Sequence, residues 1–480
     1  MKKKRTKKHN SYKRVHIYTF FKFVSRFMYL LIIPLIQHLL LQPESLIGFI
    51  GAMGFNVLSV MLLIGLSFAE YRSSIYKDNE EEISLRRGFL LRRQAKIPHS
   101  VIETVTVRRT FVSMLMGARK LHMDTPAVGN SSTDINLYLS RRRTKELIEN
   151  ILKTGEQSKS YKSNNLRIML MAATWSNSFA GLLVFIPFLN RVGKILGDEF
   201  SARLYSTVDI STYIAAIGIP PAAATIAGLM LLCWAISFLS QFFGYFGFKT
   251  DFYKDYVEIN RGFIEKSRHI IPKEKINVLQ IKQSLIMIPM RLYGAFVYTI
   301  SSGKTKGDKS MLIPAQTYSA LKQMLKDIEI FDTDDSRKIK PDRLTLISYL
   351  LYPTYITLAM AALIHFMIGK EIQTDIVWLT SAVCFIIAAL CYALMGAAHR
   401  KSFLSVNKTC VIIASHKGFS LTENIIPYDK VQCVIVQRSI FQRIGYTCNV
   451  KIYAYGERRK CFIVRQLNYK ETIALLGAKI

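Results

Sequence analysis

The sequence lacks the cysteine spacings that mark metal and redox sites. It contains seven cysteines but no Cys-x-x-Cys pair, so zinc-binding and thioredoxin-like sites are not indicated. Three cysteines lie inside apolar runs and four are scattered over the last segment of the chain. We therefore expect no metal and no cofactor, and the chain suits a reducing cytoplasm.

Complete catalytic motifs are missing as well. Ser302–Thr305 reads Ser-Gly-Lys-Thr, like the end of a phosphate-binding loop, but Tyr298 stands where that motif needs a glycine. We interpret this stretch as a hairpin turn. Asp332, Asp334 and Asp335 do not supply the full loop of oxygen ligands that calcium requires, and are interpreted as a solvated linker. No Ser-His-Asp or Cys-His set is visible, so the chain is predicted not to be an enzyme.

Acidic residues are scarce. The chain has 33 Asp and Glu against 65 Lys and Arg, a net charge of +32, yet half of its 480 residues are hydrophobic. A membrane protein with large basic cytoplasmic parts combines these properties naturally. A nucleic-acid-binding protein would explain the charge but not the apolar runs, and no interleaving of aromatic and basic residues appears. Nucleic acid is therefore not an expected partner.

Apolar runs of about 20 residues, the length that crosses a bilayer, occur six times. They come in pairs joined by connections of different length, which predicts six transmembrane helices in three hairpins, at residues 22–41 and 46–69, 166–189 and 220–242, and 346–368 and 375–397. A secretory signal is not favoured, because the first run lacks a small-residue cleavage site and a second run follows at once.

Charge predicts the orientation. Residues 1–26 hold ten Lys or Arg and no acid, whereas the first connection holds one acid and no base. Both termini and every long polar segment are therefore expected in the cytoplasm of a multi-pass protein. Within the runs, His38, His365 and Arg167 are the conspicuous polar residues, and without a carboxylate they make a poor proton relay. A transporter or an export accessory component remains the alternative function.

A sequence pattern recurs after each pair of runs. A base precedes Gly-Phe, at Gly88, Gly262 and Gly418, and Ile-Pro follows, at Pro98, Pro272 and Pro427. Apolar residues come four, seven and nine positions after each proline, and a hydroxyl residue comes at position twelve: Ile102, Val105, Val107 and Thr110; Ile276, Leu279, Ile281 and Ser284; Val431, Val434, Val436 and Ser439. A fixed internal repeat of this kind usually determines the architecture.

The spacing within the repeat predicts strands. Apolar residues at alternate positions indicate a strand with one buried face. The glycine suits a hairpin turn, the phenylalanine after it is expected to be a core anchor, and the proline is expected at the start of a strand. Further strands are predicted at 293–299 and 449–455, and closing helices at 141–153, 315–328 and 467–480. Each repeat thus predicts a small β domain with one helix.

The predicted organisation follows the three repeats. It comprises a basic N-terminus (1–21), transmembrane hairpins at 22–69, 166–246 and 346–397, and modules at 70–153, 247–329 and 400–480. On the Gly-turn, the Ile-Pro and the alternating strand that ends in Gln283-Ser284 or Arg438-Ser439, the chain resembles the bacterial PH-like domain family (bPH2, also DUF304), in its three-module membrane type. The resemblance implies a PH-like split β-barrel closed by a C-terminal helix in each module.

Basic clusters lie in the predicted cytoplasmic modules. We expect lipid or partner contacts at Arg86, Arg87, Arg92, Arg93, Arg141, Arg142, Arg143, Arg458, Arg459 and Lys460, because a base near an anionic leaflet contributes about 1 kcal/mol of binding. The general excess of Lys and Arg in cytoplasmic segments of membrane proteins is an alternative explanation for these clusters. The chain is interpreted as a non-enzymatic protein of the bacterial plasma membrane. Its modules are expected to bind anionic lipid head groups, each other or a protein partner such as a shorter PH-like membrane protein, and a homo-oligomer is also expected. The resemblance does not imply an activity, but some members of the family belong to systems for tolerance to antimicrobial peptides, and we expect a role in envelope stress or antimicrobial-peptide tolerance.

Overall fold

The fold was analysed in a computed structural model, which describes residues 12–27, 46–89, 91–126, 135–152, 157–175, 221–284, 287–300, 310–326, 338–369, 374–417, 420–455 and 460–477. The chain forms two compact units. Unit 1 comprises Met1–Ser160, Thr250–Lys275 and Thr299–Lys306; unit 2 comprises Tyr161–Lys249, Ile276–Tyr298 and Gly307–Ile480. Each unit is described by itself.

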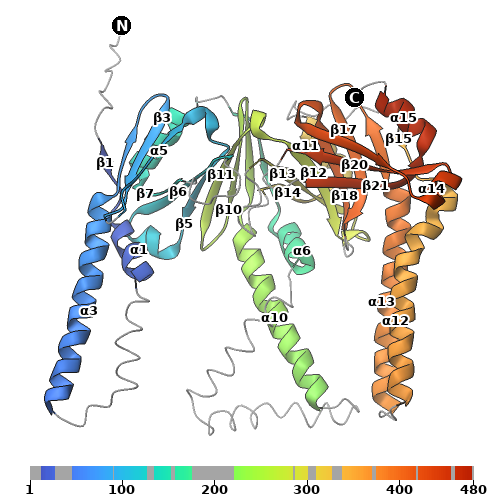
Figure 1. Ribbon diagram of the computed structural model, residues 1–480, viewed down its shortest axis with the longest axis horizontal. Coiled ribbons are helices and arrows are strands. Elements are labelled where there is room, and N and C mark those ends of the chain that lie inside the picture. Colours follow the sequence, from blue (N-terminus) through green and yellow to red (C-terminus); the bar gives the residue numbers. More distant parts are fainter. Residues whose placement is uncertain are drawn as a thin grey trace. The chain divides into compact units, whose positions relative to one another are not determined.

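One order of elements occurs three times (Figure 1). In repeat 1 a short strand precedes helices, three strands follow, and a 3-10 turn leads to three more strands and a closing helix. The elements are β1 (Lys13–Arg14), α1 (Tyr18–Phe27), α3 (Leu46–Ser73), β2 (Ile75–Asp78), β3 (Glu82–Arg87), β4 (Arg93–Pro98), η2 (His99–Val101), β5 (Thr104–Arg109), α4 (Phe111–Leu115), β6 (Ala118–Asp124), β7 (Ile135–Ser140) and α5 (Arg141–Ile151).

Repeats 2 and 3 keep this order. Repeat 2 contains β8 (Gln157–Lys162), α6 (Asn165–Trp175), α10 (Pro221–Tyr245), β9 (Lys249–Tyr253), β10 (Tyr256–Arg261), β11 (Lys266–Pro272), η4 (Lys273–Lys275), β12 (Val278–Ser284), β13 (Leu292–Tyr298), β14 (Ser310–Thr317) and α11 (Tyr318–Lys326). Repeat 3 contains β15 (Lys338–Ile339), η6 (Arg343–Thr345), α12 (Leu346–Gly369), α13 (Thr374–Lys401), β16 (Phe403–Val406), β17 (Cys410–Lys417), β18 (Ser420–Pro427), η7 (Tyr428–Lys430), β19 (Val431–Gln437), α14 (Ile440–Ile444), β20 (Thr447–Ala454), β21 (Lys460–Asn468) and α15 (Tyr469–Gly477).

The sheets join consecutive repeats. Their strand orders are β1-β2-β3-β4, β7-β6-β5-β11-β10-β9-β8, β14-β13-β12-β18-β17-β16-β15 and β19-β20-β21. Each repeat thus contributes four strands to one sheet and three to the next. The prediction of three separate barrels, one per repeat, is wrong in this respect. An alternating pattern specifies which face of a strand is buried, but not which strand lies beside it.

The prediction of six transmembrane helices in three hairpins is also wrong. Among the described residues, two helical stretches are long and apolar enough to cross a membrane, Leu346–Phe366 in α12 and Cys384–Lys401 in α13, and Leu232–Tyr245 in α10 is a shorter apolar stretch. The described parts of α1 and α6 are 10 and 11 residues long, about half of what a crossing needs. Residues 28–45 and 176–220 lie outside the described residues.

The conserved spacing of each repeat has a local cause. Gly88 and Gly262 both have φ of 101°, which glycine adopts without strain, and both follow the strand that opens the β3–β4 or β10–β11 hairpin, as predicted. Gly418 lies outside the described residues. The three prolines end β4, β11 and β18 rather than starting the next strand, because a 3-10 turn intervenes. The hydroxyl residues Thr110 and Ser439 cap the short helices α4 and α14.

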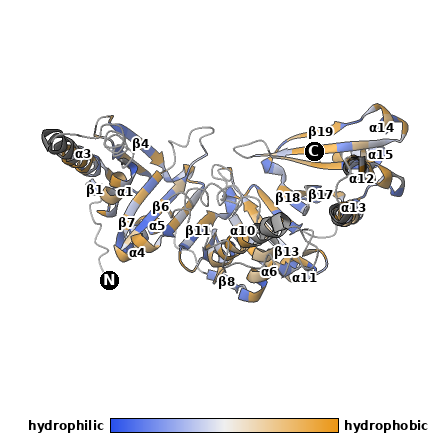
Figure 2. Cartoon of the chain, turned by 90° about the horizontal axis from the view of Figure 1, so that it is seen from below, coloured by the Kyte–Doolittle hydropathy of each residue, from blue (hydrophilic) through white to orange (hydrophobic). Residues whose placement is uncertain are grey.

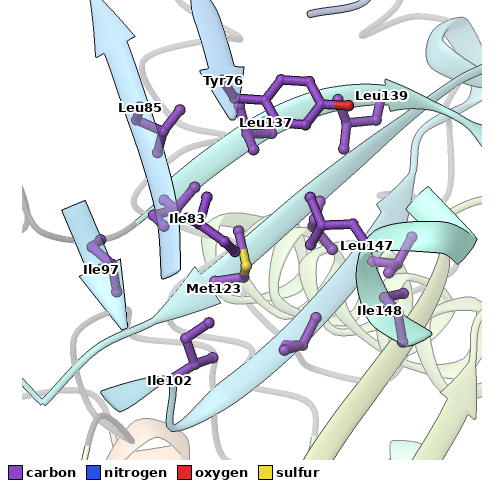
Figure 3. Packing of buried hydrophobic residues seen from close by; sticks show 14 of the residues in the cluster. Tyr76, Ile83, Leu85, Ile97, Ile102, Met123, Leu137, Leu139, Leu147 and Ile148 are labelled. Carbon is purple, nitrogen blue, oxygen red and sulfur yellow. The ribbon is translucent and has the colours of Figure 1, made fainter. Parts of the chain in front are cut away.

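The core of unit 1 lies between its four-stranded sheet, the joined sheet and α5 (Figure 3). Ile83 and Leu85 of β3, Leu137 and Leu139 of β7, and Leu147 of α5 belong to this one cluster of buried side chains. Val105 and Val107 of β5 are 1% and 4% exposed, as their alternate spacing predicts. Repeat 2 contributes Tyr256 and Ile270 to the same cluster, so the core as well as the sheet crosses the boundary between repeats.

Gly262→Ala should destabilise unit 1. A Cβ atom at Gly262 would lie 1.9 Å from the Glu265 carbonyl oxygen, and the positive φ adds strain, so we expect a loss of about 2 kcal/mol. Gly445→Ala is the matched control, because Gly445 has φ of −83° and its nearest atom would lie 3.6 Å away. Thermal unfolding of the two variants in detergent measures the difference, and equal melting temperatures would contradict the turn assignment.

Candidate membrane-facing surface

Exposed apolar side chains gather at one end of the joined sheet in unit 1. The register pairs Arg109 with Lys266 and Ala118 with Ser140, so the end of β5, the start of β11, the start of β6 and the end of β7 share this end. The short helix α4 follows β5, and the turn at residues 262–265 precedes β11. Both segments therefore lie at this end of the sheet.

These two segments present apolar side chains to solvent. On α4, Phe111, Val112 and Leu115 are 58%, 56% and 72% exposed, and the helix is coloured as hydrophobic in Figure 2. In the turn, Phe263 and Ile264 are 58% and 54% exposed. The Thr110 side chain accepts a hydrogen bond from the Ser113 backbone N–H and thereby caps α4. The helix is thus locally stabilised while these apolar side chains stay exposed.

The equivalent turn of repeat 1 lies beside a long helix. The Phe89 N–H donates to Oε2 of Glu70, near the end of α3, over 2.9 Å. Phe89 and Leu91 are 56% and 75% exposed. The prediction that the phenylalanine after the glycine is a core anchor is therefore wrong for Phe89 and Phe263, and Phe419 lies outside the described residues. An apolar residue that follows a turn glycine is at the tip of a hairpin, beyond the core.

Unit 2 has the same arrangement at α14. Ser439 and Gln442 form a capping box that fixes this helix, and Phe441 is 85% exposed, with Ile440 and Ile444 at 75% and 74%. Nearby, the Tyr349 hydroxyl at the start of α12 donates to the Arg465 carbonyl of β21 over 3.2 Å. The apolar face of α14 therefore lies at the end of its sheet where α12 begins.

Helices α12 and α13 are an antiparallel pair that projects from this end of unit 2 (Figure 1). Thr345 and His399 approach to 3.2 Å at the sheet end, and Thr354 and Tyr392 approach to 3.1 Å further out. Large apolar side chains point outward along both helices: Phe366, Trp378 and Phe385 are 63%, 77% and 76% exposed. A core helix of a soluble protein would bury such residues.

Cations accompany the apolar tips of unit 1. Burial lowers the pKa of Arg119, and the neighbouring charges of Arg109, Arg141 and Arg268 lower it further. Arg268 also forms a 2.6 Å ion pair with Glu258. Several like charges held close together at the sheet end favour an anionic ligand.

The predicted basic clusters are placed as follows. Arg86 lies over the Tyr12 ring at 4.5 Å, Arg92 precedes β4 and Arg93 begins it, and Arg141 begins α5. Arg142 pairs with Glu146, and Arg143 donates to the Arg14 carbonyl. Lys460 begins β21 opposite Ala454, at the other end of its sheet from α14. Arg458 and Arg459 lie outside the described residues, as do Ser302–Thr305 and Asp332, Asp334 and Asp335.

Unit 1 has a basic cavity of about 430 Å³, lined by residues of α1 and of the strands β3, β6 and β7. Four cationic residues and no carboxylate are among its lining residues, the cations being Lys22, Arg26, Arg87 and Lys120. Arg87 is one of the basic residues predicted to contact lipid or a partner. The other three were not predicted; Lys22 and Arg26 lie on α1 and Lys120 lies on β6. Burial lowers the pKa of Arg87, and the Glu70 carboxylate opposes that effect. The cavity can accept an anion with apolar surface beside it.

Unit 2 has a second basic cavity, of about 260 Å³, where α13 enters its sheet. Its cations are Lys338, Lys340, Arg400 and Lys401, and its carboxylate is Glu423. Lys401 Nζ donates to Gln283 Oε1 over 2.8 Å and to the Tyr293 hydroxyl over 3.3 Å. Burial raises the pKa of Glu423, while the Tyr318 hydrogen bond and nearby lysines act in the opposite direction.

Neither cavity was predicted from the sequence, because the lining residues of each cavity come from separate segments of the chain. Lys338 begins the short strand β15 and Lys340 follows it, whereas Arg400 and Lys401 end α13. The signal that could have found them is the excess of bases at the ends of apolar helices. No group of three or more His, Cys, Asp or Glu able to hold a metal occurs among the residues that the structure describes.

Comparison with known proteins agrees with the repeat. The family model described as Bacterial PH domain (bPH_2) matches residues 30–154, 208–327 and 357–477. The chain is 22% identical over 331 residues to the UPF0699 transmembrane protein YdbT of Bacillus subtilis strain 168, an alignment that covers 62% of this chain and 64% of that protein. The chain thus spans less than two thirds of this relative's length. No solved structure gives a significant match. Because the three matched segments cover well over half of its 480 residues, this protein belongs to the bacterial PH domain family.

Proposed function

We propose that this protein is a non-enzymatic binding protein of the bacterial plasma membrane, whose PH-like repeats contact anionic lipid head groups on the cytoplasmic side. The observation that carries the proposal is the set of exposed apolar tips within each unit: α4 and the hairpin turns in unit 1, which lie near cations, and α14 in unit 2, which lies where the long helix α12 begins. Such tips can enter the interface between head groups and acyl chains, where apolar side chains are stabilised.

The membrane arrangement supports this proposal. Both helices of the α12–α13 pair are long and apolar enough to cross a membrane, and the contact between Thr345 and His399 holds the start of one helix beside the end of the other at unit 2. The relative is named a transmembrane protein. The basic N-terminal segment and the net charge of +32 support a cytoplasmic location for the repeats and both termini. The two basic cavities then face the head groups, and each is large enough to hold a phosphate with part of its lipid.

The depth of α14 tests the proposal. The protein would carry Cys433→Ser, because Cys433 is the exposed cysteine among the described residues, together with Phe441→Cys labelled with an environment-sensitive fluorophore. Tyr455→Cys is the matched control, because Tyr455 is 45% exposed at the opposite end of the same sheet. In vesicles that contain brominated lipids, we expect quenching and a blue shift at residue 441 and neither at residue 455.

Two outcomes contradict this expectation. Solvent-like emission at both positions would show that α14 stays in water, and equal quenching at both would show that quenching does not report the proposed surface. Head-group preference is tested separately with short-chain phosphatidylglycerol and phosphatidylcholine in detergent. Lys340→Glu with Arg400→Glu should weaken binding of the anionic lipid by about tenfold, a loss of about 1.4 kcal/mol, whereas Lys470→Glu on α15 should leave it unchanged.

A further inference from the structure

The pairing between consecutive repeats follows one rule. In unit 1, β5 of repeat 1 pairs with β11 of repeat 2, and Val105 lies opposite Ile270. In unit 2, β12 of repeat 2 pairs with β18 of repeat 3, and Leu279 lies opposite Ile425. In both cases the residue seven positions after one proline lies opposite the residue two positions before the next. We call each of these strand pairs between consecutive repeats a joint. The two joints pair equivalent strands, in the same antiparallel direction and in the same register.

The rule leaves two strands without the neighbour that their counterparts have. Within the described part of the chain, β4 pairs with β3 alone, and β19 pairs with β20 alone. β4 is the counterpart of β11 and β18, and β19 is the counterpart of β5 and β12. The first repeat thus presents one half of the joint, and the last repeat presents the other half.

Exposure distinguishes the two edge strands from their counterparts. Six of the seven residues of β12 are buried, and none of the seven in β19 is. One of the six residues of β4 is buried, whereas β18 has five buried residues. β19 reads Val-Gln-Cys-Val-Ile-Val-Gln, without a charge or a proline. Natural edge strands usually carry a charged residue or a proline, which prevents pairing with another chain. An uncharged apolar edge strand is therefore a site where another strand can add.

The charges of β4 do not prevent pairing. β4 carries Arg93 and Lys96, but its paired counterpart β11 carries Lys266 and Arg268. Pro98 lacks a backbone N–H, yet Pro272 and Pro427 occupy the same position in strands that do pair. The internal register uses residues 266–270 and 420–425, which correspond to residues 92–96 and 91–96 in repeat 1. Pro98 falls outside that range.

We propose that β19 of one copy adds to β4 of a second copy in the register of the internal joints, with Val434 opposite Lys96. The two surfaces are different, so the contact is heterologous and each copy can bind two neighbours. The assembly therefore extends beyond a dimer as a row of repeats. This proposal is independent of lipid binding, because it uses sheet edges rather than the apolar tips.

Cysteine cross-linking between two tagged copies tests the register. Ala95 and Ile435 would lie directly opposite, and antiparallel partners have Cα atoms about 4.5–5.5 Å apart, within disulfide range. Ala95→Cys on one copy and Ile435→Cys on the other, both in Cys433→Ser protein in native membranes, should give a mixed disulfide dimer. Gln94→Cys with Ile435→Cys is the off-register control, because Gln94 points to the other face, and the mixed dimer should be lost. One chain with both cysteines should give a ladder of higher species.

Charge reversal gives a second test that leaves the fold intact, because Gln437 and Arg93 are exposed and would lie opposite each other. Gln437→Arg should reduce cross-linking several-fold through like-charge repulsion, Gln437→Glu should retain it, and Arg93→Glu should restore it in the Gln437→Arg protein. Absence of the mixed dimer, equal yield in the off-register control, or a cross-link confined to single chains would overturn the proposal. Insensitivity to all three charge variants would do the same.

Discussion

Leu279→Asp is expected to unfold unit 2, whereas Val434→Asp is expected to be tolerated. The two residues occupy the same position of the repeat, seven residues after the proline. Leu279 is fully buried in β12, between β13 and β18, and an unpaired carboxylate there adds a desolvation penalty to the lost packing. We expect a loss of at least about 4 kcal/mol. Val434 is half-buried in the edge strand β19, so its replacement should cost about 1 kcal/mol.

The measurement is chemical unfolding of the full chain in detergent, followed by limited proteolysis to locate the damage. Leu279→Asp should release sites in β12 and β18 together, because these strands from different repeats share one sheet. Damage confined to repeat 2 would show that the repeats fold separately and would contradict the joined sheet. Equal destabilisation by Val434→Asp would contradict the edge position of β19.

This pair also shows what the sequence could predict and what it could not. Alternate apolar residues correctly placed Val105, Leu279 and Ile281 on buried faces, and the same pattern assigned Val434 the same environment. The difference is the neighbouring strand, which comes from a segment about 150 residues away. Periodicity reports a strand and its face, whereas the partner is fixed by tertiary packing. The turn glycines were predicted because a positive φ is a local property.

The candidate site was accessible to sequence reasoning in part. Arg87 was predicted from its cluster, but its companions Lys22, Arg26 and Lys120 are far apart in sequence. The apolar tips were misread for a different reason. Phe89 and Phe263 have the composition of core residues, and their position beyond a turn glycine outweighs that composition. Among the described residues, two helices rather than six are long and apolar enough to cross a membrane, because apolar length alone does not fix where a helix begins and ends.

Asp124→Ala is expected to destabilise unit 1 by about 3 kcal/mol at neutral pH, because it removes one partner of a largely buried pair. Asp124 ends β6, where its carboxylate accepts a hydrogen bond from Thr104 and lies 2.7 Å from Nε2 of His122. The side chain of Asp124 is 12% exposed and that of His122 is 17% exposed. His122 also approaches Asn136 Oδ1 to 3.0 Å. Removal of the carboxylate would take this acceptor away from the Thr104 hydroxyl and from Nε2 of His122.

The pH dependence of the unfolding free energy tests whether the charge of the Asp124 carboxylate is the source of this stability. Burial raises the pKa of Asp124, but the hydrogen bond from His122, the charge of His122 and the hydrogen bond from Thr104 outweigh burial, and the pKa lies below its ordinary value of 3.8. A carboxyl group whose pKa is lowered by folding stabilises the folded state above its unfolded pKa. That stability is lost as the pH falls through the folded pKa. The difference in unfolding free energy between wild type and Asp124→Ala should therefore be present above about pH 4 and shrink below it.

Asp429→Ala is the matched control, because Asp429 lies in the 3-10 turn before β19 and its side chain is 67% exposed in an ion pair with Lys430. Exposed pairs of this kind contribute about 0–1 kcal/mol, so this variant should unfold like wild type at every pH. Chemical unfolding at neutral and acidic pH measures both variants. If the destabilisation by Asp124→Ala persisted unchanged below the folded pKa, it would arise from lost packing at β6, and the charge of the carboxylate would not be its source.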